Sequence, residues 1–546
     1  MEKNYVIGID YGTLSARAIL MDLRNGEEVA SAVYTYPHGV MDDTLPCGKK
    51  LPPLYALQHP DDYLKALGIV VREALKKADV EPQNVAGMGI DFTCCTMLPI
   101  DENGEPLCKR TEYAEEPHAY VKLWKHHGAV AYADELDAAA KKRGEPWLKA
   151  YGGSSSSEWM FPKILEILRE APEIYEKTRR FMEAADWLSL LLTSRETHSA
   201  GFAGNKSYWT EEYGYPDNAF FASVDPRLDE VIGNKISPSV NRIEEKCAGY
   251  LTEEGAELCG LPAGTPLALP LPDAHSALAA LNVTRPGDLM IILGTSTCMI
   301  TNTEKTPEID GICAYVDGGI FPGLCTVEAG QAGAGDSFDW FVKRCVPNDY
   351  IDEAKEKNIG IHQLLREKAS KLKVGENHLI ALDWWNGNRC ILKNDALSGM
   401  IVGLTLQTKP EEIYRAMIEA TAYGARRVIE NYNDNGIPIR RICVAGGIAK
   451  KDPMLMQIYA DVFGLPLELA ETAQAGARGI ALYAAVAAGI YPNIFEAAER
   501  YAMPAIATYT PIPENQEKYQ KLYEEFLILH DYFGKTNKVM ERLGNI

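Results

Sequence analysis

The sequence predicts an α/β protein in which two similar domains surround a central cleft. Its 546 residues exceed what a single hydrophobic core usually supports. The stretch "YVIGIDYGTLSARAILMDL" near the N-terminus has two apolar, strand-like segments, joined by a turn that contains Gly12, Thr13 and Ser15. The same layout returns at 289–301 in "LMIILGTSTCMIT", with Gly294 in the turn. Two such hairpins, far apart in the chain, indicate two domains of similar design that face each other.

The boundary between the domains is predicted at the proline-rich stretch "CGLPAGTPLALPLPD", residues 259–273. We therefore expect an N-terminal domain over 1–265 and a C-terminal domain over 266–546.

Helices are predicted between the strands of the first domain. Residues 61–78 begin with two aspartates, carry an apolar stripe and end in lysines, as an amphipathic helix does. Two further helices are expected over 162–181 and 185–194. The stretch "GGSSSS" at 152–157 has the composition of a loop, and we expect it to lead into a helix.

The second domain is expected to contain a strand that ends at Gly446 and a helix that follows it. Asp452 is the predicted N-cap of this helix, and Pro453 stands in its first turn. Residues 519–533 have an apolar stripe at helical spacing and are predicted to form a packing helix.

The composition restricts the partners and the compartment. A formal net charge of −21 argues against non-specific nucleic-acid binding, which depends on lysine and arginine to neutralise phosphates. We find no apolar run long enough for a membrane span and no secretory signal before the first strand. The twelve cysteines are scattered, without a C-x-x-C motif, as is typical of free thiols in a reducing cytosol. We expect a cytoplasmic protein without nucleic-acid or membrane partners; a homodimer stays open, because no residue pattern indicates the oligomeric state.

Each glycine hairpin offers backbone N–H groups and hydroxyls to an anion. Two such hairpins on opposite sides of a cleft would hold a triphosphate between them. Asp10, at the end of the first strand, is the candidate ligand of Mg²⁺, which takes few carboxylates and keeps much of its water. Arg17 supplies a cation on the second strand of the same hairpin. Either hairpin alone is better explained as a tight turn, whereas the pair with its adjacent carboxylate favours a phosphate site.

Asp273 ends the apolar stretch "LALPLPD" and precedes a predicted helix. An isolated buried charge is costly unless it has a partner or a task. Two explanations stay open at this point. Asp273 is the N-cap of the helix, or it is a general base that takes a proton from a substrate hydroxyl during phosphoryl transfer.

Several stretches together resemble the FGGY carbohydrate kinases: "IGIDYGTLSARAIL", "PDAHSAL", "LGTST", "EAGQAGAGDSFDWF" and "VAGGIAKKDPMLMQIYADVFG". Residues 399–419, "GMIVGLTLQTKPEEIYRAMIE", fit the C-terminal signature of that family position by position. The resemblance extends over nearly the whole chain. It implies an actin-like ATPase fold with two ribonuclease-H-like domains, and ATP with Mg²⁺ as the phosphoryl donor.

Within the family, the stretches "YPHGVMDDTLP", "ALQHPDDYL", "DFTCCTMLPID" and "LDWWNGNR" resemble the branch that phosphorylates L-ribulose. The chain departs from the usual N-terminal signature, because Lys163 directly follows Pro162 where the family usually has a lysine three residues after the proline. The same shift is typical of that branch. The resemblance thus implies conversion of L-ribulose to L-ribulose 5-phosphate, a step of L-arabinose catabolism.

The resemblance also implies roles for single residues. Asp273 corresponds to the catalytic base. The implied sugar-binding residues are Cys94, Thr96, Lys206, Asp273 and Glu328. The implied nucleotide-binding residues are Thr13, Ser15, Arg17, Gly294, Thr295, Gly335, Gly446, Gly447 and Lys450.

Two other functions stay open from the sequence. The first is a kinase for another ketopentose or polyol, such as D-ribulose or D-xylulose. The second is an actin-like ATP-binding protein without sugar chemistry, against which Lys206 and Glu328 count, since such a protein needs no sugar pocket. Asn386 and Arg389 either face the cleft or serve a structural role.

Overall fold

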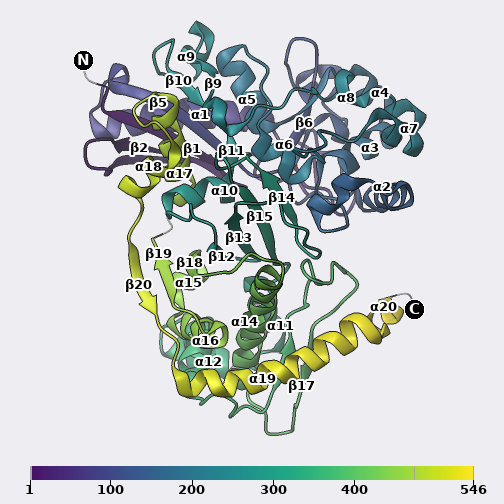
Figure 1. Cartoon of the computed structure of the whole chain (residues 1–546), viewed down its shortest axis with the longest axis vertical. Helices are drawn as coiled ribbons and strands as arrows, with labels where there is room; N and C mark the ends of the chain where they lie inside the picture. The colour runs from purple at the N-terminus through teal and green to yellow at the C-terminus, as the bar shows by residue number, and fades with distance from the viewer. Residues whose placement is uncertain (1–2, 472–473, 545–546) are drawn as a thin grey trace.

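Two seven-stranded sheets organise the chain, and helices pack against both. The computed structural model describes residues 3–471 and 474–544. The N-terminal half occupies the upper part of the view in Figure 1 and most of the C-terminal half the lower part. Helix α10 (Asp273–Ala280) lies where the two halves meet.

The first sheet has the strand order β3-β2-β1-β5-β10-β9, and β11 also pairs with β5. Strand β2 runs antiparallel to both β1 and β3, whereas β1 and β10 run parallel to β5. The strands are β1 (Tyr5–Tyr11), β2 (Ser15–Asp22), β3 (Glu28–Thr35), β5 (Val85–Phe92), β9 (Cys247–Tyr250), β10 (Pro266–Ala268) and β11 (Leu271–Pro272).

The second sheet has the order β14-β15-β13-β12-β18-β19-β20. Strand β13 runs antiparallel to β12 and β15, whereas β18 runs parallel to β12 and β19. The strands are β12 (Asp288–Leu293), β13 (Thr297–Thr303), β14 (Ala314–Asp317), β15 (Cys325–Gln331), β18 (Arg441–Ala445), β19 (Leu467–Ala470) and β20 (Ala505–Tyr509). The series β15-β13-β12-β18-β19 thus repeats the order and directions of β3-β2-β1-β5-β10. The prediction of two similar α/β domains is confirmed, and β1–β2 and β12–β13 are equivalent hairpins.

Two smaller sheets have the orders β4-β7-β6-β8 and β16-β17. Although β6 follows β5 closely in sequence, it pairs with β7 and β8, so the chain leaves the first sheet at Cys94 and Cys95. The strands are β4 (Leu57–Gln58), β6 (Met97–Ile100), β7 (Val121–Lys122), β8 (Arg180–Glu183), β16 (Ile380–Leu382) and β17 (Met400–Val402).

The helix predicted over 61–78 is confirmed as α1, which packs on β2 and β3. The helix predicted over 162–181 is divided in two, because Pro172 lacks the N–H that would continue the first part. The helices before α10 are α1 (Pro60–Ala78), α2 (Val130–Arg143), α3 (Met160–Glu170), α4 (Pro172–Lys177), α5 (Ala184–Thr193), α6 (Ala200–Lys206), α7 (Asn218–Val224), α8 (Val231–Asn234) and α9 (Glu253–Cys259).

The helix predicted after Asp452 is confirmed as α16, and the Asp452 carboxylate accepts a hydrogen bond from the backbone N–H of Leu455 at 3.0 Å. Residues 519–531 of the predicted packing helix belong to α19, which buries Tyr519, Tyr523 and Phe526, and its last two residues begin a π-helical turn. The helices after α10 are α11 (Gly335–Cys345), α12 (Asn348–Glu356), α13 (Ile361–Ala369), α14 (Pro410–Asp434), α15 (Gly447–Lys451), α16 (Pro453–Phe463), α17 (Ala475–Ala487), α18 (Ile494–Tyr501), α19 (Pro513–Asp531) and α20 (Val539–Gly544).

Helix α17 comes late in the chain but packs with α10 against β1 and β5 of the first sheet. A Cβ atom on Gly8 would overlap the carbonyl oxygen of Ala477, and one on Gly89 would lie 2.5 Å from the carbonyl oxygen of Ile480. These two glycines therefore let the helix lie directly on the sheet. As a result, a segment of the C-terminal half covers one face of the N-terminal sheet.

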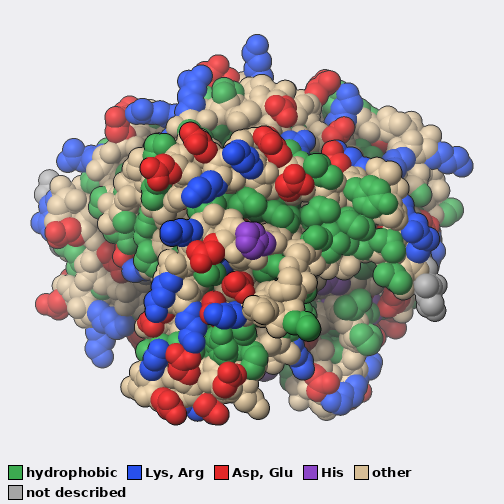
Figure 2. Space-filling view, turned by 90° about the horizontal axis from the view of Figure 1, so that it is seen from below, with side chains coloured by type: hydrophobic (Ala, Val, Ile, Leu, Met, Phe, Trp, Pro, Cys, Tyr) green, Lys and Arg blue, Asp and Glu red, His purple; other side chains and the backbone are tan. Residues whose placement is uncertain are grey.

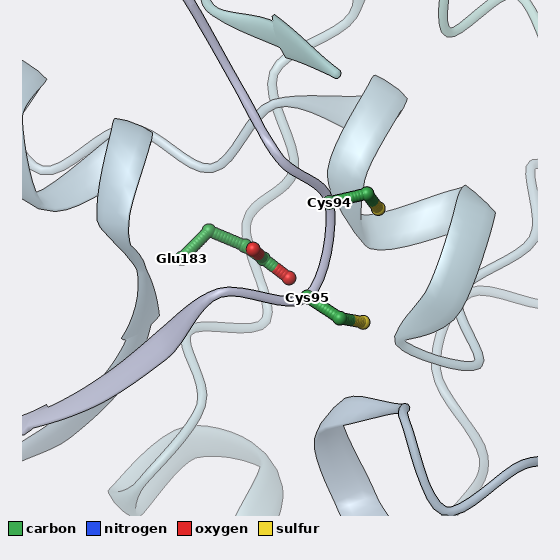
Figure 3. A group of neighbouring side chains, drawn as sticks. All are labelled: Cys94, Cys95 and Glu183. Carbon is green, nitrogen blue, oxygen red and sulfur yellow. The ribbon is translucent and has the colours of Figure 1, made fainter. Parts of the chain in front are cut away.

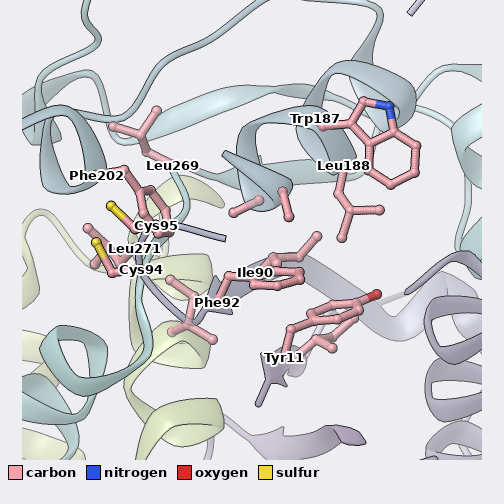
Figure 4. Packing of buried hydrophobic residues seen from close by; sticks show 14 of the residues in the cluster. Tyr11, Ile90, Phe92, Cys94, Cys95, Trp187, Leu188, Phe202, Leu269 and Leu271 are labelled. Atoms are coloured by element: carbon pink, nitrogen blue, oxygen red, sulfur yellow. The ribbon is translucent and has the colours of Figure 1, made fainter. Parts of the chain in front are cut away.

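Each sheet has its own hydrophobic core. In the first core, the rings of Tyr11 and Phe92 stack with their centroids 4.9 Å apart, near Ile90 (Figure 4). This packing holds the ends of β1 and β5, the strands that carry Asp10 and Asp91.

The domain boundary at 265/266 stays a prediction. Strands β10 and β11 follow this position and belong to the first sheet. None of the helices in the described part of the chain is both long and apolar enough to cross a membrane. On the face of the molecule in Figure 2, lysines and arginines lie interspersed with acidic side chains.

Candidate active site

Asp273 is the first residue of α10, directly after β11. Pro272 is the N-cap residue, so Asp273 is not the N-cap, although one of its carboxylate oxygens accepts a hydrogen bond from the N–H of Ala274 at 2.7 Å. Its side chain lines a cavity of about 140 Å³. Burial, with the nearby charge of Asp10, raises the pKa of Asp273 to about 7. A carboxylate with this pKa is suited to accept a proton near neutral pH.

The first glycine hairpin places Asp10 opposite Arg17 in the register of β1 and β2. The Nε atom of Arg17 lies 3.4 Å from a carboxylate oxygen of Asp10. The turn is closed by a hydrogen bond from the N–H of Gly12 to the carbonyl oxygen of Ser15 at 3.0 Å. At its tip, the hydroxyl oxygen of Thr13 accepts a hydrogen bond from the indole of Trp124 at 3.1 Å.

Asp91 lies beside Asp10 on the parallel strand β5, and the sequence-based prediction missed it. The hydroxyl of Ser276 donates a hydrogen bond to Asp91 at 2.7 Å, which ties this carboxyl group to α10. Burial, and then the charge of Asp10, holds the pKa of Asp91 well above its usual range. A signal was present in the sequence, because "GIDY" and "GIDF" end the two strands in the same way.

The donor set formed by Asp10 and Asp91 fits Mg²⁺, which prefers oxygen ligands from one or two carboxylates. Burial also raises the pKa of Asp10, because a carboxylate charge is unfavourable away from water. A cation at this place would offset the negative charges of both buried carboxyl groups. A Cβ atom on Gly476 would lie 3.2 Å from Asp91 and 3.4 Å from Asp10. The glycine at this position of α17 thus leaves room next to both carboxyl groups.

Lys206 and Glu328 line the same cavity as Asp273. Lys206 ends α6 in the first domain, and Glu328 lies on β15 in the second. Although burial opposes both charges, Lys206 lowers the pKa of Glu328, and Glu328 raises that of Lys206. Asn205 donates to Glu328 at 3.4 Å, and Nε2 of His275 lies 3.6 Å from it. The structure therefore brings together the three predicted sugar-binding residues that carry charge.

The predicted sugar contacts Cys94 and Thr96 lie differently. Cys94 lines the cavity, whereas Thr96 is fully buried with its hydroxyl 2.7 Å from that of Thr93. Thr93 rather than Thr96 faces the cavity. Figure 3 shows Cys94 next to Cys95 and Glu183, and burial holds the pKa of Glu183 well above its usual range.

The second glycine hairpin packs against the start of α11. Gly335 donates its N–H to the carbonyl oxygen of Gly294 at 3.1 Å, and Ala334 donates to that of Thr295 at 2.8 Å. Gly446 has a φ of 110°, and a Cβ atom there would overlap the carbonyl oxygen of Leu293. The glycines predicted to bind the nucleotide in this domain are thus neighbours.

Two other predicted nucleotide contacts, Gly447 and Lys450, lie on the short helix α15. Outside its chain neighbours and the backbone of its own helix, no described atom lies within 4 Å of the place where Gly447 would carry a Cβ atom, so its backbone is open to a ligand. The ammonium group of Lys450 is instead bound to the carboxylate of Glu471 at 2.8 Å.

A larger cavity of about 430 Å³ is lined by Thr295 and Ser296 of the second hairpin. Trp124, whose indole donates a hydrogen bond to Thr13 of the first hairpin, lines it as well. Asn386 and Arg389 also line it, so both face the cleft. Prediction from the sequence missed Trp124, Glu158 and His127, which belong to the same wall and had no local motif.

The two related domains, the paired hairpins and the buried carboxyl groups in the cleft define a phosphotransferase with an actin-like ATPase fold. Residues 5–280 match the model of the N-terminal domain of the FGGY family of carbohydrate kinases, and residues 289–488 match that of its C-terminal domain. The chain belongs to this family. It is an ATP-dependent carbohydrate kinase, and the predicted fold class is confirmed.

Curated relatives match over almost the whole length. A ribulokinase from Bacillus licheniformis is 47% identical, with 98% of this chain and 97% of the relative covered. One from Mycolicibacterium smegmatis is 45% identical, with 99% and 96% covered. Among solved structures, a xylulose kinase from Rhodospirillum rubrum has a TM-score of 0.79 at 23% identity, covering 96% of this chain and 98% of that one. A glycerol kinase from Plasmodium falciparum has a TM-score of 0.76 at 17% identity, covering 97% and 98%.

Proposed function

We propose that the protein transfers the γ-phosphoryl group of ATP to O5 of L-ribulose and so serves the use of L-arabinose. The observation that supports this most directly is the convergence of Asp273, Lys206 and Glu328 on one cavity of about 140 Å³. This volume is smaller than the roughly 300 Å³ at which pockets for larger ligands begin, and it suits a small polyol. The ribulokinases that match 45–47% of the residues over nearly the full chain support the choice of sugar.

In this mechanism Asp273 accepts the proton of the O5 hydroxyl as the oxygen attacks the γ-phosphorus. The new O5–P bond forms while the bond from the γ-phosphorus to the bridging oxygen breaks, and ADP leaves. The pKa of about 7 keeps much of Asp273 ionised at neutral pH, while the carboxylate stays basic enough to take the proton.

Lys206 and Glu328 hold the sugar in a complementary way. The ammonium group donates hydrogen bonds to sugar oxygens, and the carboxylate accepts them from sugar hydroxyls. Because the two residues come from different domains, a bound sugar contacts both sides of the cleft. This fixes the angle at which O5 meets the phosphoryl group.

The two glycine hairpins are the proposed phosphate sites. Thr13, Ser15 and Arg17 face the phosphates from the first domain, and the turn at Gly294 and Thr295 faces them from the second. Asp10 and Asp91 are the carboxyl groups placed to hold Mg²⁺. When bound, this ion neutralises charge on the phosphates. The cytoplasm is the proposed compartment, because the twelve cysteines are all free thiols.

A substrate panel tests the proposal. ADP release is measured with L-ribulose, D-ribulose, L- and D-xylulose and glycerol, and the position of the phosphate is read by NMR. We expect the highest kcat/KM with L-ribulose and phosphate on O5. Asp273→Ala is expected to abolish turnover while ADP still binds. A clear preference for another acceptor, or sugar-independent ATP hydrolysis alone, contradicts the proposal.

A further inference from the structure

Residues 388–393, here called the clasp, connect the second domain to the first across the cleft. They belong to the long loop between β16 and β17. Arg389 and Lys393 of this segment line the larger cavity together with Ser154 to Glu158 of the first domain. Residues of the clasp, which belong to the second domain, therefore line the same cavity as residues 154–158 of the first domain.

Lys393 has an acceptor for each of its three N–H donors. Its ammonium group donates to the carbonyl oxygens of Tyr151 at 2.6 Å and Ser154 at 3.1 Å in the first domain, and of Ile312 at 3.2 Å in the second. Burial lowers the pKa of this lysine. A buried ammonium group is costly without partners, and here backbone groups of both domains satisfy it.

Arg389 makes the second connection. Its guanidinium group lies 3.5 Å from the carboxylate of Glu158, which is mostly buried. Both residues line the smaller cavity as well, together with Asp273 and Lys206. The ion pair therefore forms part of the wall of the proposed sugar site.

The backbone of the clasp is strained. Ile391 has a φ of 133° and Lys393 a φ of 48°. Such values are rare for residues other than glycine, above all for a β-branched one, and persist only where the surroundings hold them. A Cβ atom on Gly311 would lie 2.6 Å from the carbonyl oxygen of Ile391, and one on Gly152 would lie 2.5 Å from that of Ile312. The backbone of the clasp thus packs directly on Gly311 of the second domain. The next residue, Ile312, packs in turn on Gly152 of the first domain.

We propose that Lys393 and Arg389 are positioning residues, which hold the loop 154–158 of the first domain in place and so keep Glu158, at the end of this loop, in the wall of the sugar site. This inference rests on the proposed sugar kinase function and adds residues to it. Lys393 fixes the backbone of the loop, and Arg389 orients Glu158. Loss of either contact loosens the sugar site, whereas the phosphate hairpins keep their own hydrogen bonds.

Lys393→Met tests the first contact, because methionine replaces the unbranched stem of the lysine side chain up to Cε but has no donor. We expect the KM for sugar to rise about tenfold or more, as the loss of a charged hydrogen bond of roughly 1.5 kcal/mol implies, while the KM for ATP stays within about twofold. Lys149→Met is the matched control. Lys149 also reaches across the cleft, to Glu308 at 3.3 Å, but both side chains are exposed, and such pairs contribute little. An equal rise of both KM values, or no rise, overturns the proposal.

A double-mutant cycle tests the second contact. Glu158→Gln and Arg389→Gln are each expected to raise the KM for sugar, and the double variant is expected to be no worse than the worse single variant. Arg389→Lys, which keeps the charge, should recover part of the loss. Additive effects would mean that each residue contacts the sugar by itself, and would overturn the assignment.

Hydrogen exchange of the amides at 154–158 provides a readout that does not depend on activity. We expect faster exchange in Lys393→Met than in the wild type and in Lys149→Met. Unchanged exchange overturns the proposal. If the wild type phosphorylates no sugar, the proposed function fails, and the exchange measurement still decides whether the clasp holds the loop.

Discussion

At the scale of single residues, a raised pKa does not by itself identify the catalytic base. Burial raises the pKa of both Asp273 and Asp186 to about 7. Asp186 accepts a hydrogen bond from the N–H of Ser199 inside the first domain, whereas Asp273 faces the cavity that Lys206 and Glu328 also line. Position therefore decides between two carboxyl groups of similar acidity.

The pH dependence of sugar phosphorylation follows from Asp273. Protonated Asp273 cannot accept the hydroxyl proton, so kcat/KM should level off above about pH 8, be half-maximal near pH 7 and fall about tenfold per pH unit below about pH 6. The measurement is a rate profile from pH 5 to 9. Asp186→Asn is the matched control and should keep the acid limb. A profile that is flat through pH 6 in the wild type contradicts the assignment of the base.

The carboxyl groups at the ends of β1 and β5 predict the metal dependence. Asp10→Asn and Asp91→Asn each remove one charged oxygen donor, so the Mg²⁺ concentration needed for half-maximal ADP binding should rise about tenfold or more, as is usual for a lost ligand or its neighbour. Calorimetric titration of ADP at several Mg²⁺ concentrations measures this without turnover. Asp22→Asn is the control, since Asp22 pairs with Arg24 at the other end of β2. Unchanged Mg²⁺ dependence in both variants would move the metal site elsewhere.

At the scale of elements, the contact between α17 and the first sheet depends on glycine. Gly8 and Gly89 leave no side chain between the strands and the helix, so the backbones approach closely. The same helix carries Gly476 beside Asp10 and Asp91. A packing feature of the sheet thus also shapes the proposed metal site.

Gly89→Ala tests this contact. The added methyl group would lie 2.5 Å from the carbonyl oxygen of Ile480, and such overpacking should lower the free energy of unfolding by about 1–3 kcal/mol. Urea unfolding followed by circular dichroism measures the change. Gly544→Ala is the control, because no described atom outside its own helix lies within 4 Å of the added Cβ atom. Equal stability of the two variants would show that the helix can shift away from the sheet at little cost.

At the scale of the whole molecule, the N-terminal domain includes a helix from the C-terminal half of the chain. Helix α17 covers the first sheet although it follows the second sheet's strand β19 in the chain. The first hydrophobic core includes Ala477, Ile480 and Ala484 of this helix. The N-terminal domain therefore needs a segment from the other half of the chain to complete its core.

A fragment experiment tests this dependence. Residues 1–280 alone would expose the apolar face of β1 and β5, so we expect the fragment to aggregate or to unfold without cooperativity. The control joins residues 474–503 to the fragment through a flexible linker and should restore cooperative thermal unfolding. Cooperative unfolding of the fragment without α17 would contradict the prediction.

The sequence by itself determined the two glycine hairpins and the α/β class, and it singled out Asp273 as a candidate. Each of these depends on residues that are neighbours in the chain: a turn between two apolar strands, or a carboxylate at the end of an apolar run. The similarity of the two domains could be predicted for the same reason, because one local pattern occurs twice.

Only the tertiary structure decided which other residues lie next to the hairpins and line the cavity with Asp273. Asp91 is next to Asp10 because β5 pairs with β1, and Thr93 rather than Thr96 faces the cavity because the chain turns into another sheet. Glu158 and Arg389 meet only because the two domains face each other across the cleft. The physical reason is that strand pairing and domain contact bring together residues that can be hundreds of positions apart in the sequence. No local sequence pattern indicates which of these side chains share one cavity.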